Sequence, residues 1–248
     1  MSASLMLHCG AREVTRDQLS LVPCPPPEGR WRPVPHVTVL DYAEKALLDA
    51  GYGVEKLQLG LSRDDARFFG TLTLRSPVAS GVSLAVGLRS STDKSISLQW
   101  ACGSRVFVCD NLAFRSEKVI ARKHTTNGVL RYQEAICRAV SELASYREEE
   151  HRRIQAMQYR EVGDDFALAF LLRAYQDEAI LSPRSLPVAL REWREPSFEE
   201  FSDRTAWSLF NAVTFAIGDR TRTNPQKHAA LTIRLGAMLD GPHLSTPA

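Results

Sequence analysis

The sequence predicts an α+β protein in which an antiparallel β-meander sheet in the N-terminal half packs with a mostly helical C-terminal half. Apolar residues alternate with polar ones through most of residues 54–109, which is the period of half-buried strands. From residue 128 to about residue 240 the apolar spacing is that of helices. Strands first and helices afterwards are typical of α+β folds and not of alternating parallel folds.

Residues 1–37 are predicted to form an N-terminal extension that packs on another surface. Thr15 and Gln18 have the spacing of a capping box, which predicts one helical turn ending near Leu21. The following segment, residues 23–35 (PCPPPEGRWRPVP), is called the proline-rich strap below; proline lacks an N–H group and restricts its neighbour, so regular structure is excluded there. Trp31 is expected to anchor the strap to the core, with stacking on a ligand as the alternative. Residues 38–248 are expected to form a single domain.

A helix and a series of strands open that domain. Thr38 is the expected N-cap of a helix that runs to about Ala50, and Gly51 ends it. Turn-forming residues separate the alternating runs and predict short connections, hence antiparallel neighbours. The runs cover residues 57–61, 68–74, 82–88 and 96–102, and the turns cover Ser62–Asp65, Ser76–Gly81 and Ser90–Lys94. A last run, Arg105–Cys109, either continues the preceding strand or forms a separate one.

The C-terminal half is predicted to be helical. A long helix begins near residue 128 and runs into the charged stretch 147–153, which is expected to be a solvated face with charges of both signs. A second helix begins near Asp164, where Asp164 and Asp165 suit a helix N-terminus, and ends before Pro183. A third runs from about Ser202 through Ile217, and Pro225 fits the first turn of a fourth.

Composition narrows the class of protein. With 44% hydrophobic and 24% charged residues, the 248-residue chain is an ordinary globular protein. The net charge of +2 means that attraction to a polyanion must come from local clusters of cations. Five irregularly spaced cysteines without a CxxC pair suit a reducing compartment. The N-terminal residues lack a signal-peptide pattern and no apolar run could span a membrane, so we expect a cytoplasmic protein.

Two segments carry a family resemblance. Residues 104–127 (SRVFVCDNLAFRSEKVIARKHTTN) contain Arg105, Val106, Cys109, Asn111 and a Lys123-His124-Thr125 element. Residues 204–220 (RTAWSLFNAVTFAIGDR) contain Thr205, Trp207, Asn211, Ala212, Val213 and Thr214. Together they resemble the phage/plasmid-like proteins classed as domain of unknown function 932, whose members show an Arg-Val-x-Cys-x-Asn core, a short helix, a basic–His–Thr element and a later Thr-x-Trp-x-x-x-Asn-Ala-Val-Thr helix.

The resemblance extends over about residues 55–240 and leaves the first fifty residues outside. It implies a mobile-element setting and supplies no established activity. The sequence departs from the family pattern in two places: Asp110 replaces the second Asn of a Cys-Asn-Asn run, and Gly218-Asp219 replaces an acidic–His pair.

Basic residues concentrate in two windows. Residues 101–131 hold six Lys and Arg against two acidic residues, a balance of +4, and residues 219–234 hold four against one, a balance of +3. Arg and Lys side chains bind phosphates by charge and by hydrogen bonds. The alternative is that these cations scatter and pair with the acids of 148–150 and 199–203. The candidate nucleic-acid-binding residues are Arg105, Arg115, Lys118, Arg122, Lys123, His124, Arg220 and Arg222.

Aromatic and cysteine residues in the same region have two interpretations each. Trp100, Phe107 and Phe114 interleave with the cations and suit base stacking, although Trp100 shares its parity with core positions. Cys109 with His124 and either Asn111 or Asp110 has the residue types of a nucleophile, a base and an orienting group. A cysteine in an alternating apolar run is more typical of the core. Zinc binding by Cys102, Cys109 and His124 lacks the usual ligand spacing.

From these patterns we expect a protein that binds single-stranded DNA without catalysing a reaction, with strand annealing as one form of that activity. No cofactor or metal is expected, and homo-oligomer formation is left open. The first alternative is a protein-interaction module in phage defence or counter-defence. The second is a hydrolase that uses Cys109 and His124.

Overall fold

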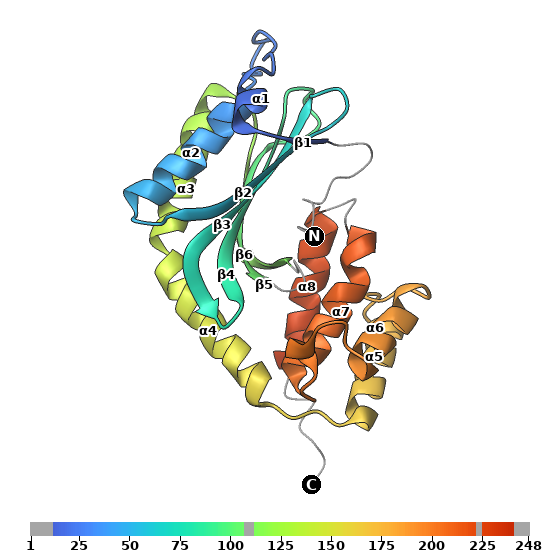
Figure 1. Ribbon diagram of the computed structural model, residues 1–248. Helices are drawn as coiled ribbons and strands as arrows, with labels where there is room; N and C mark the ends of the chain where they lie inside the picture. Colours follow the sequence, from blue (N-terminus) through green and yellow to red (C-terminus); the bar gives the residue numbers. More distant parts are fainter. Residues whose placement is uncertain (1–11, 107–111, 222–224, 241–248) are drawn as a thin grey trace. The chain divides into compact units, whose positions relative to one another are not determined.

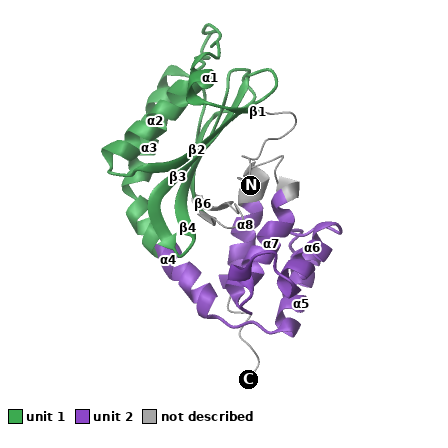
Figure 2. Cartoon of the chain, viewed as in Figure 1, with its two compact units in different colours: residues 1–105, 116–148 green, residues 106–115, 149–248 purple. Residues whose placement is uncertain are grey.

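The computed structural model describes residues 12–106, 112–221 and 225–240, and within these ranges it describes the side chains except at 105, 106, 112–119, 219–221 and 225–229 (Figure 1). The chain divides into two compact units (Figure 2). Unit 1 consists of residues 1–105 and 116–148, and unit 2 of residues 106–115 and 149–248. Helix α4, Leu143–Tyr159, continues from one unit into the other. The single domain expected for residues 38–248 stays a prediction.

Unit 1 is built on a six-stranded antiparallel sheet, which confirms the predicted α+β class. The strands are hydrogen-bonded in chain order, so β1 and β6 form the two edges. Leu59 pairs with Gly70 and Gly70 with Leu88, which places the alternating apolar residues of neighbouring strands on one face. The strands are β1 (Arg12–Val14), β2 (Val54–Leu61), β3 (Arg67–Ala79), β4 (Val82–Ser91), β5 (Leu98–Val106) and β6 (Leu112–Arg122).

Helices α2 (His36–Asp49) and α3 (Thr126–Ser141) lie against one face of this sheet (Figure 1). The core between them contains fully buried Phe68, Trp100 and Tyr132. The Tyr132 hydroxyl donates a hydrogen bond to the Gln99 carbonyl oxygen at 3.1 Å, and burial raises the pKa of Tyr132 above its usual range. The core interpretation of Trp100 is therefore confirmed.

The N-terminal helix α1 (Arg16–Ser20) has the predicted capping box, with the Thr15 hydroxyl and the Gln18 side chain each bonded to the other's backbone. Helix α2 begins earlier than predicted. Its N-cap is Pro35 and not Thr38, because the Val39 N–H group already donates to the Pro35 carbonyl oxygen at 3.2 Å.

Two predictions about the strands were wrong. The turn expected to begin at Ser76 begins later, because β3 continues to Ala79 and Pro77 pairs with Ser83. The short helix implied by the resemblance is replaced by strand β6. Ile120 in β6 is buried, and Ala121 and Arg122, the last two residues of the strand, are exposed. The last run continues β5 as far as Val106; Phe107, Cys109 and Asn111 lie outside the described residues.

Unit 2 is mostly helical, and α7 is its central helix. Almost every residue of α7 from Ala206 to Ile217 is buried, and the helix packs against α6 and α8. A helix with buried residues on all sides belongs in the middle of a unit. The elements are α5 (Asp164–Gln176), α6 (Ser185–Arg194), a 3-10 turn η1 (Glu199–Phe201), α7 (Ala206–Thr221) and α8 (Pro225–Asp240).

The helical predictions for the second half need four corrections. The long helix is interrupted between Ser141 and Leu143, where α3 ends and α4 begins. Helix α6 was not predicted; its Pro187 lies in the first turn, where no N–H group is needed. The third helix begins at Ala206 and not near Ser202. Finally, the stretch 147–153 is not wholly solvated, because Glu150 is 1% exposed.

The remaining helix starts agree more closely with the sequence. Pro225 is the first residue of α8, as predicted. Asp164 and Asp165 lie in the first turn of α5, but Gly163 is the N-cap and neither carboxylate caps the helix. The Asp164 carboxylate accepts a hydrogen bond from Trp193 Nε1 at 2.9 Å. Among the helices in the described part of the chain, none has the length and apolar composition to cross a membrane.

Candidate nucleic-acid interface

The Lys123-His124-Thr125 element joins β6 to α3. We refer to Arg122–Thr125 as the hook, because the chain reverses there within a few residues. The Thr125 N–H group donates to the Lys123 carbonyl oxygen at 2.9 Å, a three-residue turn. Thr125 is the N-cap of α3, and its hydroxyl oxygen accepts the Gly128 N–H group at 3.0 Å. The family-motif residue Thr125 therefore fixes the backbone of the hook.

Arg122 and Lys123 are exposed on the hook. The Arg122 guanidinium donates from Nη1 to the neighbouring Ala121 carbonyl oxygen at 2.8 Å. Neither cation has an ion pair with any residue that the structure describes. Two adjacent cations at the end of an edge strand can therefore contact an anion from solvent.

His124 lies in the interior, in contrast to its two neighbours. It is 5% exposed, and its Nε2 hydrogen-bonds to the Ile96 carbonyl oxygen at 3.2 Å, with the Ser90 hydroxyl at 3.5 Å. Burial lowers the pKa of His124 below its ordinary value. A neutral ring held by an interior carbonyl cannot contact a phosphate at the surface, so His124 supports the hook and is left out of the interface.

A second buried histidine, His36, has a similar environment. It is 1% exposed, its Nε2 bonds to the Asp65 carbonyl oxygen at 3.0 Å, and its ring stacks on Phe68 with the centroids 5.6 Å apart. Burial lowers the pKa of His36, and a charge on His36 would in turn lower the pKa of His124. In the folded protein both rings therefore take up a proton less readily than an exposed histidine.

These two histidines predict that acid destabilises unit 1. An unfolded histidine has a pKa of about 6.5, and both folded values are lower, so the unfolded state binds more protons below that pH. The contribution of the two histidines to the free energy of unfolding is therefore fully present above about pH 6.5. It is lost as the pH falls toward the pKa values of the folded state. Melting temperatures measured from about pH 7.5 to about pH 5.5 should fall in the wild type. The double variant His36→Gln/His124→Gln should show a flatter profile, and an equally steep profile in that variant would contradict the assignment.

The proline-rich strap meets the hook through its backbone. The Arg32 N–H group donates to the His124 carbonyl oxygen at 2.7 Å. Glu28 and Trp31 exchange two backbone hydrogen bonds of 3.1 and 2.9 Å around Gly29, whose φ of +57° suits glycine. Lys94 lies 4.9 Å from the centre of the Trp31 ring and pairs with Glu28. Trp31 thus ties the strap to the connection between β4 and β5.

For the other predicted phosphate-binding residues, the structure describes at most the backbone. Arg105 lies on β5, Arg115 and Lys118 lie on β6, and Arg220 lies on α7, with only their backbones described. Arg222 lies outside the described residues, as do Cys109 and Asn111. Of the candidate set, the structure describes the side chains of the consecutive residues Arg122, Lys123 and His124, of which the first two are exposed and the third is buried.

The second family motif lies on α7 in unit 2 and serves the packing of that helix. Trp207 stacks on Phe210 with the ring centroids 5.8 Å apart. Asn211 is 1% exposed; its Nδ2 donates to the Trp207 carbonyl oxygen at 2.9 Å, and its Oδ1 has no partner among the residues that the structure describes. The Thr205 hydroxyl accepts the Ser208 N–H group at 3.2 Å, which is the geometry of a helix cap.

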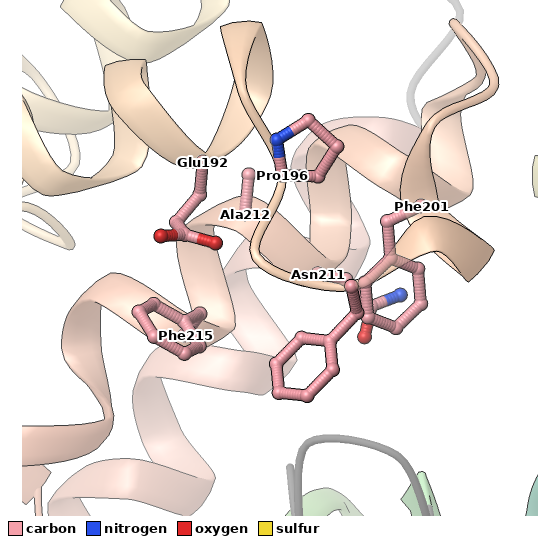
Figure 3. Close-up of a pocket in the computed structure, with 7 residues that line it drawn as sticks. Glu192, Pro196, Phe201, Asn211, Ala212 and Phe215 are labelled. Atoms are coloured by element: carbon pink, nitrogen blue, oxygen red, sulfur yellow. The ribbon is translucent and has the colours of Figure 1, made fainter.

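A small pocket in unit 2 adjoins this motif (Figure 3). Its space of about 210 Å³ includes open solvent and leaves room for one water-sized group. The Glu192 carboxylate is held by Ser197, which donates from its backbone at 3.0 Å and from its hydroxyl at 2.9 Å. No group of three His, Cys, Asp or Glu side chains suited to a metal occurs in the described part of the chain. The pocket is lined by Glu192, Pro196, Phe198, Phe201, Asn211, Ala212 and Phe215.

Fold and site together define a two-unit α+β protein with an exposed pair of cations at the edge of an antiparallel sheet. The chain belongs to the family described as Domain of unknown function (DUF932), whose model matches residues 27–235. The match confirms the resemblance and extends it, because it includes the strap from residue 27 and not only the chain from about residue 55. No curated protein and no solved structure matches the chain.

Sequence reasoning missed the strap as a neighbour of the hook. The signal present in the sequence is Arg30-Trp31-Arg32, two cations around an aromatic residue in a segment that prolines restrict. These residue types suit contacts with phosphates and bases, but the sequence does not show that they lie beside the hook. The hydrogen bond from Arg32 to His124 joins residues that are far apart in the sequence, and no local pattern encodes it.

Proposed function

We propose that this protein binds single-stranded nucleic acid without catalysing a reaction, as a cytoplasmic component of a phage or plasmid-type system. The observation that carries the proposal is the exposure of Arg122 and Lys123, side by side on the hook and without an ion pair among the described residues. Such cations neutralise phosphates regardless of base sequence.

The hook is well suited to this role because its backbone is fixed before a ligand arrives. The Thr125 cap, the turn from Thr125 to Lys123 and the buried ring of His124 all hold it. A fixed backbone lowers the entropy lost on binding. Trp31 lies half-buried next in sequence to Arg32, so an aromatic side chain accompanies the cations, a combination that suits a single strand.

The hydrolase alternative loses support from the position of His124. A general base must reach the group that it deprotonates. His124 Nε2 instead bonds to the Ile96 carbonyl oxygen in the interior. A protein-interaction module stays as the second candidate, favoured by Leu168 and Leu172, which are 39% and 49% exposed one turn apart on α5.

The test of the proposed function is fluorescence anisotropy with a labelled single strand of about 30 nucleotides. We expect binding at about 50 mM salt that weakens with a log–log slope of about −0.7 per phosphate contacted. The variant Arg122→Ala/Lys123→Ala should bind roughly tenfold more weakly to every sequence, with a slope that is smaller in magnitude by about 1.4.

A matched control removes the same charge elsewhere. Arg184 and Arg194 are exposed residues of unit 2, and Arg184→Ala/Arg194→Ala should bind like the wild type. Duplex DNA of the same length tests the preference for single strands and should bind more weakly. Absence of any binding at low salt would rule out the proposed function and leave the interaction module.

A further inference from the structure

We infer that the proline-rich strap contributes a second pair of phosphate contacts, Arg30 and Arg32, to the same nucleic-acid interface. The inference rests on the proposed function and names residues outside both basic windows of the sequence. It is supported by the position of the strap, by its charge balance and by its rigidity.

The position follows from one short backbone hydrogen bond. Because the Arg32 N–H group donates to the His124 carbonyl oxygen at 2.7 Å, the strap backbone runs directly against the hook. His124 is the residue after Lys123, so Arg32 and Lys123 lie on adjoining stretches of backbone in unit 1. A phosphate backbone that contacts one pair of cations therefore passes close to the other pair.

The charge balance of this surface favours an anionic ligand. Arg30 and Arg32 are exposed, and neither has an ion pair with a residue in the described part of the chain. Glu28 is the acidic residue of the strap, and it is already paired with Lys94. With that pair neutral, strap and hook together present four positive charges and no unpaired carboxylate of their own. A cluster of like charges attracts a polyanion and raises its rate of association.

The rigidity of the strap makes these cations effective. The turn from Glu28 to Trp31 is closed by backbone hydrogen bonds, and Pro33 and Pro35 restrict the chain that follows. The Arg32 guanidinium donates from Nη1 to the Gly29 carbonyl oxygen at 3.1 Å, which holds it against the turn. Arginine so placed presents its remaining N–H groups in a fixed fork, the geometry that recognises phosphate.

The experiment compares strap and hook variants in the same anisotropy assay, with the full chain and the same labelled single strand. We expect Arg30→Ala/Arg32→Ala to weaken binding about tenfold for all sequences and to reduce the magnitude of the salt slope by about 1.4. The charge-conserving variant Arg30→Lys/Arg32→Lys should retain the slope and recover affinity to within about threefold of the wild type. Unchanged melting temperatures would show that the losses do not arise from unfolding.

The outcomes separate the two proposals. If the wild type binds, the hook variant is weakened and the strap alanine variant binds like the wild type, the strap inference is wrong and the proposed function stands. The lysine variant could instead bind as weakly as the alanine variant, with an equal fall in the magnitude of its salt slope. In that case the positive charge of the strap is not the cause of the lost affinity, and the inference is also overturned. If the wild type does not bind at low salt, the proposed function itself has failed.

Discussion

Replacing Gly128 by alanine is expected to destabilise unit 1 by about 3 kcal/mol or more, a large effect for the addition of one methyl group. Gly128 is buried in the first turn of α3, where the hook folds back over the helix start. A Cβ atom at this position would lie far inside contact distance of the Lys123 carbonyl oxygen and 2.8 Å from the Thr125 hydroxyl. The carbonyl belongs to the backbone, so the clash is relieved only if the hook moves and the Thr125 cap is weakened.

Urea denaturation followed by circular dichroism measures this loss. The matched control is Gly218→Ala on α7, where an added Cβ meets no described atom within 4 Å. That variant should be neutral or more stable by up to about 1 kcal/mol, because alanine favours a helix over glycine. Equal stability of Gly128→Ala and the wild type would contradict the close approach of the hook to α3. A folded Gly128→Ala protein should also bind nucleic acid more weakly, since Lys123 is displaced.

The elements that sequence predicted well are those whose causes are local. The capping box of α1 needs only Thr15 and Gln18, three residues apart, and it forms as expected. The alternating runs predicted most of the sheet, because one buried face imposes a period of two. The start of α8 at Pro225 also has a local cause, because the missing N–H group of proline is harmless only in the first turn of a helix.

The elements that sequence missed are a charged strand and a helix that contains a proline. The segment that forms strand β6 contains Arg115, Glu117, Lys118 and Arg122, and the resemblance suggested a helix in its place. Helix α6 contains Pro187, whose effect depends on where the helix begins. The effect of a proline or a charged residue on secondary structure therefore cannot be predicted until its position within the helix or strand is known.

The candidate site was partly predictable for the same physical reasons. Local charge density identified the segment that holds Arg122 and Lys123. It also included His124, because a histidine beside two cations resembles a phosphate-binding residue until its partner Ile96, far back in the chain, is known. The cations of the strap were not among the candidate residues, because only the hydrogen bond from Arg32 to His124 places the strap at the hook.

The charged pair inside unit 2 gives the second large prediction: Glu150→Ala should destabilise the protein by about 3–5 kcal/mol. The side chain of Glu150 is 2% exposed and that of Arg153 is 11% exposed. The Glu150 carboxylate accepts two hydrogen bonds from Arg153, at 3.0 and 2.9 Å. The guanidinium also lies 5.5 Å from the centre of the Phe210 ring on α7. Removing the carboxylate would leave a buried cation without this partner, which costs far more than losing an exposed ion pair.

A double-mutant cycle identifies the origin of that loss. If the cost arises from the charge left behind, replacing both partners by apolar residues of similar size, Glu150→Leu/Arg153→Met, should restore stability to within about 1 kcal/mol of the wild type. Urea unfolding of Glu150→Leu, Arg153→Met and the double variant supplies the coupling energy. If the losses in the single variants simply add in the double variant, the two side chains act independently and the assigned charge pairing is contradicted. Strong coupling would assign the loss to the charge pair within α4, separate from the cations of the hook and the strap.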